Sequence, residues 1–141
     1  MTRTAVASSS QIAADAGADI AEAGGNAVDA AIAASLLQLV TEPGIVSLGA
    51  GNFIVIWPPD EHPVMIDASS EMPGRNASVE LIGRGGLDVI LLYGGGTPTT
   101  VGYASVATPG AIAGYALASQ RYGKLPWKML VEPAYHHVKK G

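Results

Sequence analysis

The chain has 141 residues, of which 48% are apolar and 14% are charged, and its formal net charge is −4. This length is enough for one hydrophobic core, so we expect a single domain over residues 1–141. The mild excess of acidic residues gives no reason to expect nucleic-acid binding. Because the chain contains no cysteine, both a disulfide framework and a thiolate metal site are excluded.

The N-terminal residues show no secretory signal, since the segment after Arg3 has no apolar stretch of useful length. The most apolar run, residues 27–40, contains Asp29 and Ser35 and is shorter than a membrane span. We therefore expect a cytoplasmic protein that does not bind membranes.

The segment from Ala23 to Ala34 predicts the end of one helix and the start of another. The pair Gly24-Gly25 can adopt the positive φ that closes a helix. Asn26 can then accept a backbone N–H as the N-cap of the next helix, and Asp29 places a carboxylate in its first turn. We interpret Asp29 as a capping residue rather than a catalytic acid.

Apolar spacing predicts a first helix over residues 11–23 and a second, buried on most sides, over residues 28–40. The second helix should end at Thr41-Glu42-Pro43, because a residue before proline avoids the helical region. Two strands are predicted at 52–57 and 64–67. The first of them is apolar almost throughout, which is typical of a strand covered on both faces.

The next stretch, residues 68–100, predicts irregular structure, with glycine runs on both sides of an apolar segment of undetermined type at 87–93. Order returns at Thr108-Pro109, which predicts an N-cap followed by proline at the first helical position. A helix should follow from about residue 111 to 121, and a final helix should run from about residue 127 to the end of the chain.

Two ordered motifs resemble the start of the large subunit of gamma-glutamyltranspeptidases. The family's Ala-Gly-Gly-Asn-Ala-Val-Asp-Ala-Ala is matched by residues 23–31 without a substitution, and a Glu-Pro and a glycine-rich run into a Phe-led strand follow it. The second motif, a Val-x-x-Pro-Gly helix start followed by Tyr-Gly-Lys-Leu-Pro-Trp and Pro-Ala, is matched by residues 106–110, 122–127 and 133–134. The resemblance covers nearly the whole chain and is weakest over residues 68–100.

The resemblance implies an α/β (α+β) fold: a partial αββα sandwich of the N-terminal nucleophile hydrolase type. In that family the nucleophile is the threonine that begins the small subunit, and its own α-amino group can accept the hydroxyl proton. None of the threonines that lie in regions similar to the large subunit is therefore expected to be catalytic: Thr2, Thr41, Thr97, Thr99, Thr100 and Thr108. We expect no catalytic residue in this chain, and a small-subunit-like partner or self-association to complete it.

The substrate-binding residues depart from the family's pattern. After the second strand the family has Asp-x-Arg-Glu-x-x-Pro, whose arginine holds the α-carboxylate of the substrate. Alignment of Asp67 and Pro73 places Ser69 at the arginine position, and a serine cannot replace a bidentate guanidinium. The charged neighbours Glu71 and Arg75 complete our set of candidate substrate-binding residues.

Other sites are predicted to be structural. His136 and His137 are adjacent and would point about 100° apart on a helix, so we expect no metal, and no other cofactor is implied. Trp57 and Trp127 are interpreted as packing residues.

Three functions stay open: gamma-glutamyl transfer or hydrolysis, for example of glutathione; hydrolysis of a different acyl amide by a related amidohydrolase; and a catalytically inactive binding or assembly module. An uncovered apolar sheet face in such a partial fold would favour oligomers.

Overall fold

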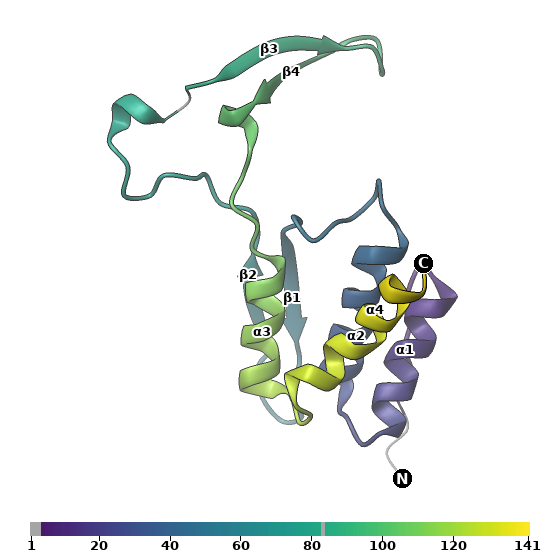
Figure 1. Cartoon of the computed structure of the whole chain (residues 1–141). Helices are drawn as coiled ribbons and strands as arrows, with labels where there is room; N and C mark the ends of the chain where they lie inside the picture. Colours follow the sequence, from purple (N-terminus) through teal and green to yellow (C-terminus); the bar gives the residue numbers. More distant parts are fainter. Residues whose placement is uncertain (1–3, 83) are drawn as a thin grey trace. The chain divides into compact units, whose positions relative to one another are not determined.

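The structure is a computed structural model that describes residues 4–82 and 84–141. It contains two compact units, which are described separately (Figure 1). The larger unit consists of residues 4–69 and 109–141, and the smaller unit consists of residues 70–82 and 84–108.

The larger unit begins with two helices, α1 (Gln11–Glu22) and α2 (Ala27–Thr41), joined by a short turn. Gly24 has φ of 99° in this turn. The side chain of Asn26 accepts hydrogen bonds from the N–H groups of Val28 and Asp29, both at 3.0 Å. The Asp29 carboxylate in turn accepts from the N–H of Asn26, which completes a capping box. The predicted helix joint and the capping roles of Asn26 and Asp29 are confirmed.

Helix α2 lies at the centre of the larger unit and is buried on most sides, as predicted. Helices α1 and α4 (Trp127–Lys140) both pack against it, and Figure 1 shows the three helices side by side. The residues of α2 that enter the core are Ile32, Ala33, Leu36, Leu37 and Leu39. Helix α4 contributes Leu130, which is fully buried, and Ala134.

Strands β1 (Asn52–Ile56) and β2 (Val64–Ala68) form an antiparallel hairpin, with Asn52 opposite Ala68 and Ile56 opposite Val64. Helix α3 (Ala111–Tyr122) packs against both strands. Successive side chains of a strand point to opposite faces, so only alternate residues are buried against the helices.

The outer face of this hairpin is exposed, and the prediction that β1 is covered on both faces is wrong for the described residues. Phe53 is 63% exposed and Val55 is 67% exposed, and Met65 of β2 lies on the same face. The prediction that Trp57 is a packing residue is also wrong, because its side chain is 76% exposed. Trp127 does pack against the core and is partly buried.

The start of α3 differs from the prediction. The helix begins at Ala111 with Gly110 as N-cap, and no side chain caps it. Thr108 and Glu71 instead form an isolated antiparallel bridge, in which each main-chain N–H donates to the other residue's carbonyl oxygen. The N–H of Ala111 donates to the carbonyl oxygen of Ala50 at 3.0 Å, which ties the helix start to the loop before β1.

The smaller unit contains a second antiparallel hairpin, β3 (Gly86–Leu91) and β4 (Thr97–Gly102), and two short 3-10 helices, η1 (Val79–Leu81) and η2 (Tyr103–Ser105). The prediction of irregular structure up to residue 100 is therefore wrong for this hairpin. Three successive glycines with positive φ, residues 94–96, build the turn between the strands. Residues 87–91 of the apolar segment form strand β3.

Among the described residues, no helix combines the length and apolar character needed to cross a membrane.

Candidate functional site

The three predicted substrate-binding residues are divided between the units. Ser69 ends the first segment of the larger unit, is exposed, and donates its N–H to Oδ1 of Asp67 at 3.0 Å. Glu71 and Arg75 belong to the smaller unit. The structure therefore brings Glu71 and Arg75 together and assigns Ser69 to the other unit.

Arg75 and Glu71 form an ion pair on the surface of the smaller unit, with the guanidinium donating to Oε1 of the carboxylate. Their side chains are 75% and 53% exposed. The hydrogen bond from Arg75 to Glu71, and then the negative charge of Glu71, raise the pKa of Arg75 above its ordinary value. Arg75 therefore stays positively charged at neutral pH, and a substrate carboxylate would compete with Glu71 for it.

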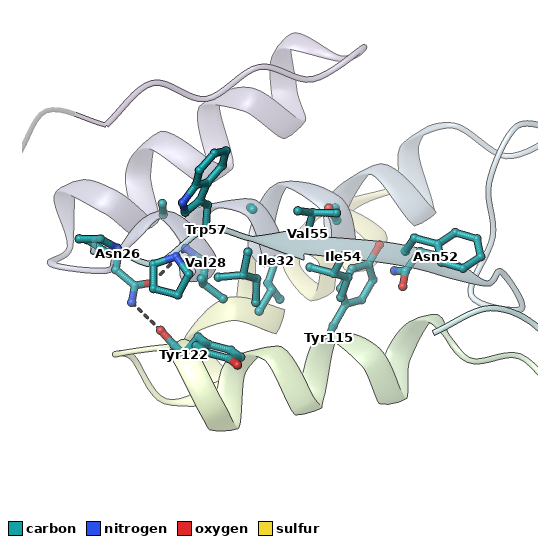
Figure 2. Close-up of a pocket in the computed structure, with 16 residues that line it drawn as sticks. Asn26, Val28, Ile32, Asn52, Ile54, Val55, Trp57, Tyr115 and Tyr122 are labelled. Carbon is teal, nitrogen blue, oxygen red and sulfur yellow. Dashed lines mark hydrogen bonds between the residues drawn. The ribbon is translucent and has the colours of Figure 1, made fainter. Parts of the chain in front are cut away.

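The larger unit also contains a groove that the sequence did not predict. This β1–α2 groove has a volume of about 660 Å³ and lies between β1, α2 and α3. Figure 2 shows its lining, in which the side chain of Tyr115 from α3 lies next to Ile54 of β1. The lining residues carry no charged side chain; the main ones are Asn26, Val28, Ala31, Ile32, Ser35, residues 52–57, Tyr115 and Tyr122.

Asn52, one of the residues that line this groove, has an unpartnered amide buried beside Gly114 of α3. Both its side-chain oxygen and its side-chain nitrogen are buried, and neither has a hydrogen-bond partner among the described residues. A buried polar group left without a partner costs about 1–3 kcal/mol, so such a group calls for an explanation. The one signal in the sequence is that Asn52 is the polar residue of an otherwise apolar strand.

The buried carboxylate of Asp29 links the start of α2 to the turn between α3 and α4. Asp29 is fully buried, and its oxygens accept from the N–H of Lys124 at 3.0 and 3.1 Å and from the N–H of Leu125 at 3.3 Å. The side chain of Asn26 donates to the carbonyl oxygen of Tyr122 at 2.7 Å, a bond drawn in Figure 2. These contacts occupy Asp29 structurally, which agrees with its interpretation as a capping residue rather than a catalytic acid.

Within residues 4–82 and 84–141, no three His, Asp or Glu side chains are grouped so that they could hold a metal ion.

Curated proteins with similar sequences are much longer than this chain. Scoloptoxin SSD14 of Scolopendra dehaani is 38% identical over 139 residues, which are 98% of this chain and 22% of the relative. The glutathione hydrolase proenzyme of Pseudomonas aeruginosa is 33% identical over 137 residues, which are 97% of this chain and 23% of that protein. The chain thus spans less than a quarter of the length of these relatives.

Solved structures confirm the predicted fold class. The cephalosporin acylase from Bacillus halodurans matches all of this chain and 26% of its own, with a TM-score of 0.78 and 29% identity. The transpeptidase CapD of Bacillus anthracis matches all of this chain and 40% of its own, with a TM-score of 0.75 and 26% identity. The chain therefore has the mixed helix–sheet fold of part of an N-terminal nucleophile hydrolase.

The family model described as gamma-glutamyltranspeptidase matches residues 13–141, nearly the whole chain. Both motifs recognised in the sequence lie within this match, and in the structure they meet at Asp29 and Lys124. The chain belongs to the gamma-glutamyltranspeptidase family.

Proposed function

We propose that this chain is the scaffold part of an amidase or transpeptidase that acts on gamma-glutamyl amides such as glutathione. The observation that carries the proposal is the family match over residues 13–141, together with 33% identity to a glutathione hydrolase proenzyme. In this role the larger unit supplies a helical layer and a hairpin, and the pair of Glu71 and Arg75 forms part of the substrate wall.

The nucleophile of this reaction comes from outside the 141 residues. The family's threonine begins a small subunit, and this chain corresponds to less than a quarter of the relatives' length. The threonine hydroxyl would attack the amide carbonyl while its α-amino group accepts the proton, and that proton would pass to the amine as the C–N bond breaks. The amine leaves, and the acyl group stays on the threonine as an ester, which water or an acceptor amine then cleaves. This requires a partner polypeptide, or a further segment, that carries the threonine.

Hydrolysis of a different acyl amide is a second candidate, and the residue at position 69 favours it. A serine there cannot form the two charge-assisted hydrogen bonds by which an arginine holds a carboxylate. The likeness to a cephalosporin acylase, with a TM-score of 0.78, is compatible with a substrate that lacks the γ-glutamyl α-carboxylate.

A reconstitution assay tests the proposal. The chain is purified alone and also co-expressed with the polypeptide that corresponds to the unmatched remainder of the Pseudomonas aeruginosa glutathione hydrolase proenzyme. Both samples are given γ-glutamyl p-nitroanilide and, separately, an anilide of an acyl group without an α-carboxylate. We expect no release of nitroaniline by the chain alone and release of it from γ-glutamyl anilide by the pair.

The outcomes separate the candidates. Activity of the chain alone would contradict a nucleophile outside these residues. Activity of the pair on the second anilide only would favour the second candidate. The control is a pair in which alanine replaces the first threonine of the added small subunit, because this variant should assemble without turnover. The expected cytoplasmic location stays a prediction.

A further inference from the structure

Gly110, the glycine of the Val-x-x-Pro-Gly motif, has no part in the function proposed above. It is the N-cap of α3 and belongs to the larger unit, in which α3 lies alongside β2 (Figure 1). Its φ is −106°, and residues with a side chain also adopt negative φ. The backbone conformation at this position therefore does not require a glycine.

The main chain at the end of β2 is what excludes a side chain at Gly110. A Cβ atom built there would lie 2.5 Å from the carbonyl oxygen of Ala68 and still closer to that of Ser69. Because Cβ atoms do not approach other heavy atoms within 3.0 Å, the end of β2 would have to move by at least about 0.5 Å. The glycine thus allows a direct contact between the start of α3 and residues 68–69.

Further contacts keep α3 from moving away instead. The N–H of Ala111 donates to the carbonyl oxygen of Ala50 at 3.0 Å, which holds the helix start to the loop before β1. One turn along the helix, Gly114 has no side chain, and the methyl group of the buried Ala68 occupies that space. A side chain at residue 110 would therefore displace the end of β2 rather than the helix.

We propose that Gly110 is a positioning residue for substrate selectivity: by allowing this close contact it fixes the main chain of residue 69, whose side chain faces the α-carboxylate of the substrate. The inference rests on the proposed function and on the alignment that gives residue 69 this place. Groups that hold a substrate tolerate displacements of only about 0.5 Å, which is the size of the shift that a Cβ atom would impose. The Pro-Gly motif and the segment after β2 thus act together on the same substrate group.

An arginine introduced at residue 69 reports on this position in the co-expressed pair described above. Ser69→Arg should raise kcat/KM for γ-glutamyl p-nitroanilide by about tenfold or more when residue 110 is glycine. In Gly110→Ala the same substitution should raise it by less than about threefold, and the difference should lie in KM, because a binding contact is lost. Ser69→Arg should not raise the value for the anilide without an α-carboxylate in either background. Reduced folding would lower both substrates' values equally, so this comparison separates positioning from stability.

Gly123→Ala is the matched control. Gly123 follows the last turn of α3 and also has a negative φ, of −75°. A Cβ atom there would lie 2.6 Å from the carbonyl oxygen of Ser119 and 2.7 Å from Oδ1 of Asp29. This variant carries a similar overlap at the opposite end of the same helix, so Ser69→Arg should keep its full gain in it.

Nuclear magnetic resonance of the chain alone tests the contact without any activity. Gly110→Ala should shift the main-chain amide signals of residues 68 and 69, whose carbonyl groups would have to move. Gly123→Ala should instead shift those of residues 124 and 125, which donate to the Asp29 carboxylate that it contacts. Unchanged signals of residues 68 and 69 in Gly110→Ala would overturn the inference. A Gly110→Ala chain that no longer folds would also overturn it and assign the glycine to folding.

The kinetic outcomes separate this inference from the proposed function. A full gain from Ser69→Arg in Gly110→Ala, or an equally reduced gain in Gly110→Ala and Gly123→Ala, would refute the positioning role in a pair that is still active. No gain from Ser69→Arg in the parent pair would show that residue 69 does not contact the substrate carboxylate, which also refutes this role alone. A pair that turns over neither anilide would refute the proposed function and the inference together.

Discussion

The carboxylate of Asp29 accepts the main-chain N–H of Lys124 although 95 residues separate them. The same carboxylate accepts the N–H of Asn26 at the start of α2. One buried side chain thus caps one helix and fixes the turn between α3 and α4. The two sequence motifs that identify the family are the two sides of this single contact, which explains why both are present in one scaffold.

Removal of this carboxylate should destabilise the larger unit strongly. Asp29→Ala leaves the partly buried N–H groups of Asn26, Lys124 and Leu125 without their acceptor. Each such group costs about 1–3 kcal/mol, so we expect the free energy of unfolding to fall by at least about 3 kcal/mol. Urea unfolding followed by tryptophan fluorescence measures this change, because both tryptophans belong to the larger unit.

Asp19→Ala is the control for this experiment, since Asp19 is an exposed residue of α1. Its effect should stay within about 0.5 kcal/mol, as is usual for surface substitutions. Equal stabilities of the Asp29 and Asp19 variants would contradict the role given to the buried carboxylate.

The second prediction concerns stability and follows from the close packing of α3 on β2. A Cβ atom at Gly114 would overlap the Cβ atom of Ala68. Alanine in place of glycine inside a helix normally stabilises by roughly 0.5–1 kcal/mol, but overpacking costs about 1–3 kcal/mol. We therefore expect Gly114→Ala to lower the free energy of unfolding.

The double variant Gly114→Ala/Ala68→Gly relieves the overlap and should recover part of the lost stability. The coupling energy between the two sites should be at least about 0.5 kcal/mol, measured by the same urea unfolding. A single Gly114→Ala variant more stable than the parent chain would show that the hairpin moves aside without cost.

Local patterns in the sequence were sufficient to predict where the helices lie. The cap residues Asn26 and Asp29 act on their own first turn, so the joint between α1 and α2 follows from a few neighbouring residues. Thr108 failed as a cap because its main chain pairs with Glu71, a distant residue that no local pattern indicates. Long-range pairing overrode local preference there.

The errors at the strands have a related cause. An apolar strand predicts burial on both faces, and β1 exposes one face because no described residue covers it. Hairpin β3–β4 was missed because β4 contains a proline and three threonines and because no residue of either strand is buried. The β1–α2 groove was not predictable either, since its walls come from segments far apart in the chain.

Substrate selectivity gives a third prediction. Ser69→Arg restores the guanidinium at the family's carboxylate-binding position, and Ser69 is exposed, so the fold should tolerate it. In the co-expressed pair we expect kcat/KM for γ-glutamyl p-nitroanilide to rise by about tenfold or more, because hydrogen bonds to charged groups contribute about 1.5–3 kcal/mol. The value for the anilide without an α-carboxylate should not rise.

Ser70→Arg adds the same charge one residue later, at another exposed position, and should leave both kcat/KM values within about twofold. If both arginine variants gained equally, general attraction of the anionic substrate would explain the result. If neither gained, Ser69 would not occupy the position that the alignment gives it.

The exposed outer face of the β1–β2 hairpin makes the last prediction. Phe53, Val55 and Met65 are each more than 60% exposed on this face, and adjacent apolar residues of this kind favour association. We expect the chain alone to self-associate in sedimentation velocity and Val55→Lys to shift it toward monomer. Ile45→Lys is the control, because Ile45 is 81% exposed in a loop outside the hairpin and should not change the sedimentation coefficient. A chain that sediments as a monomer without any substitution would show that this face needs no cover, and equal effects of both lysines would assign the change to net charge.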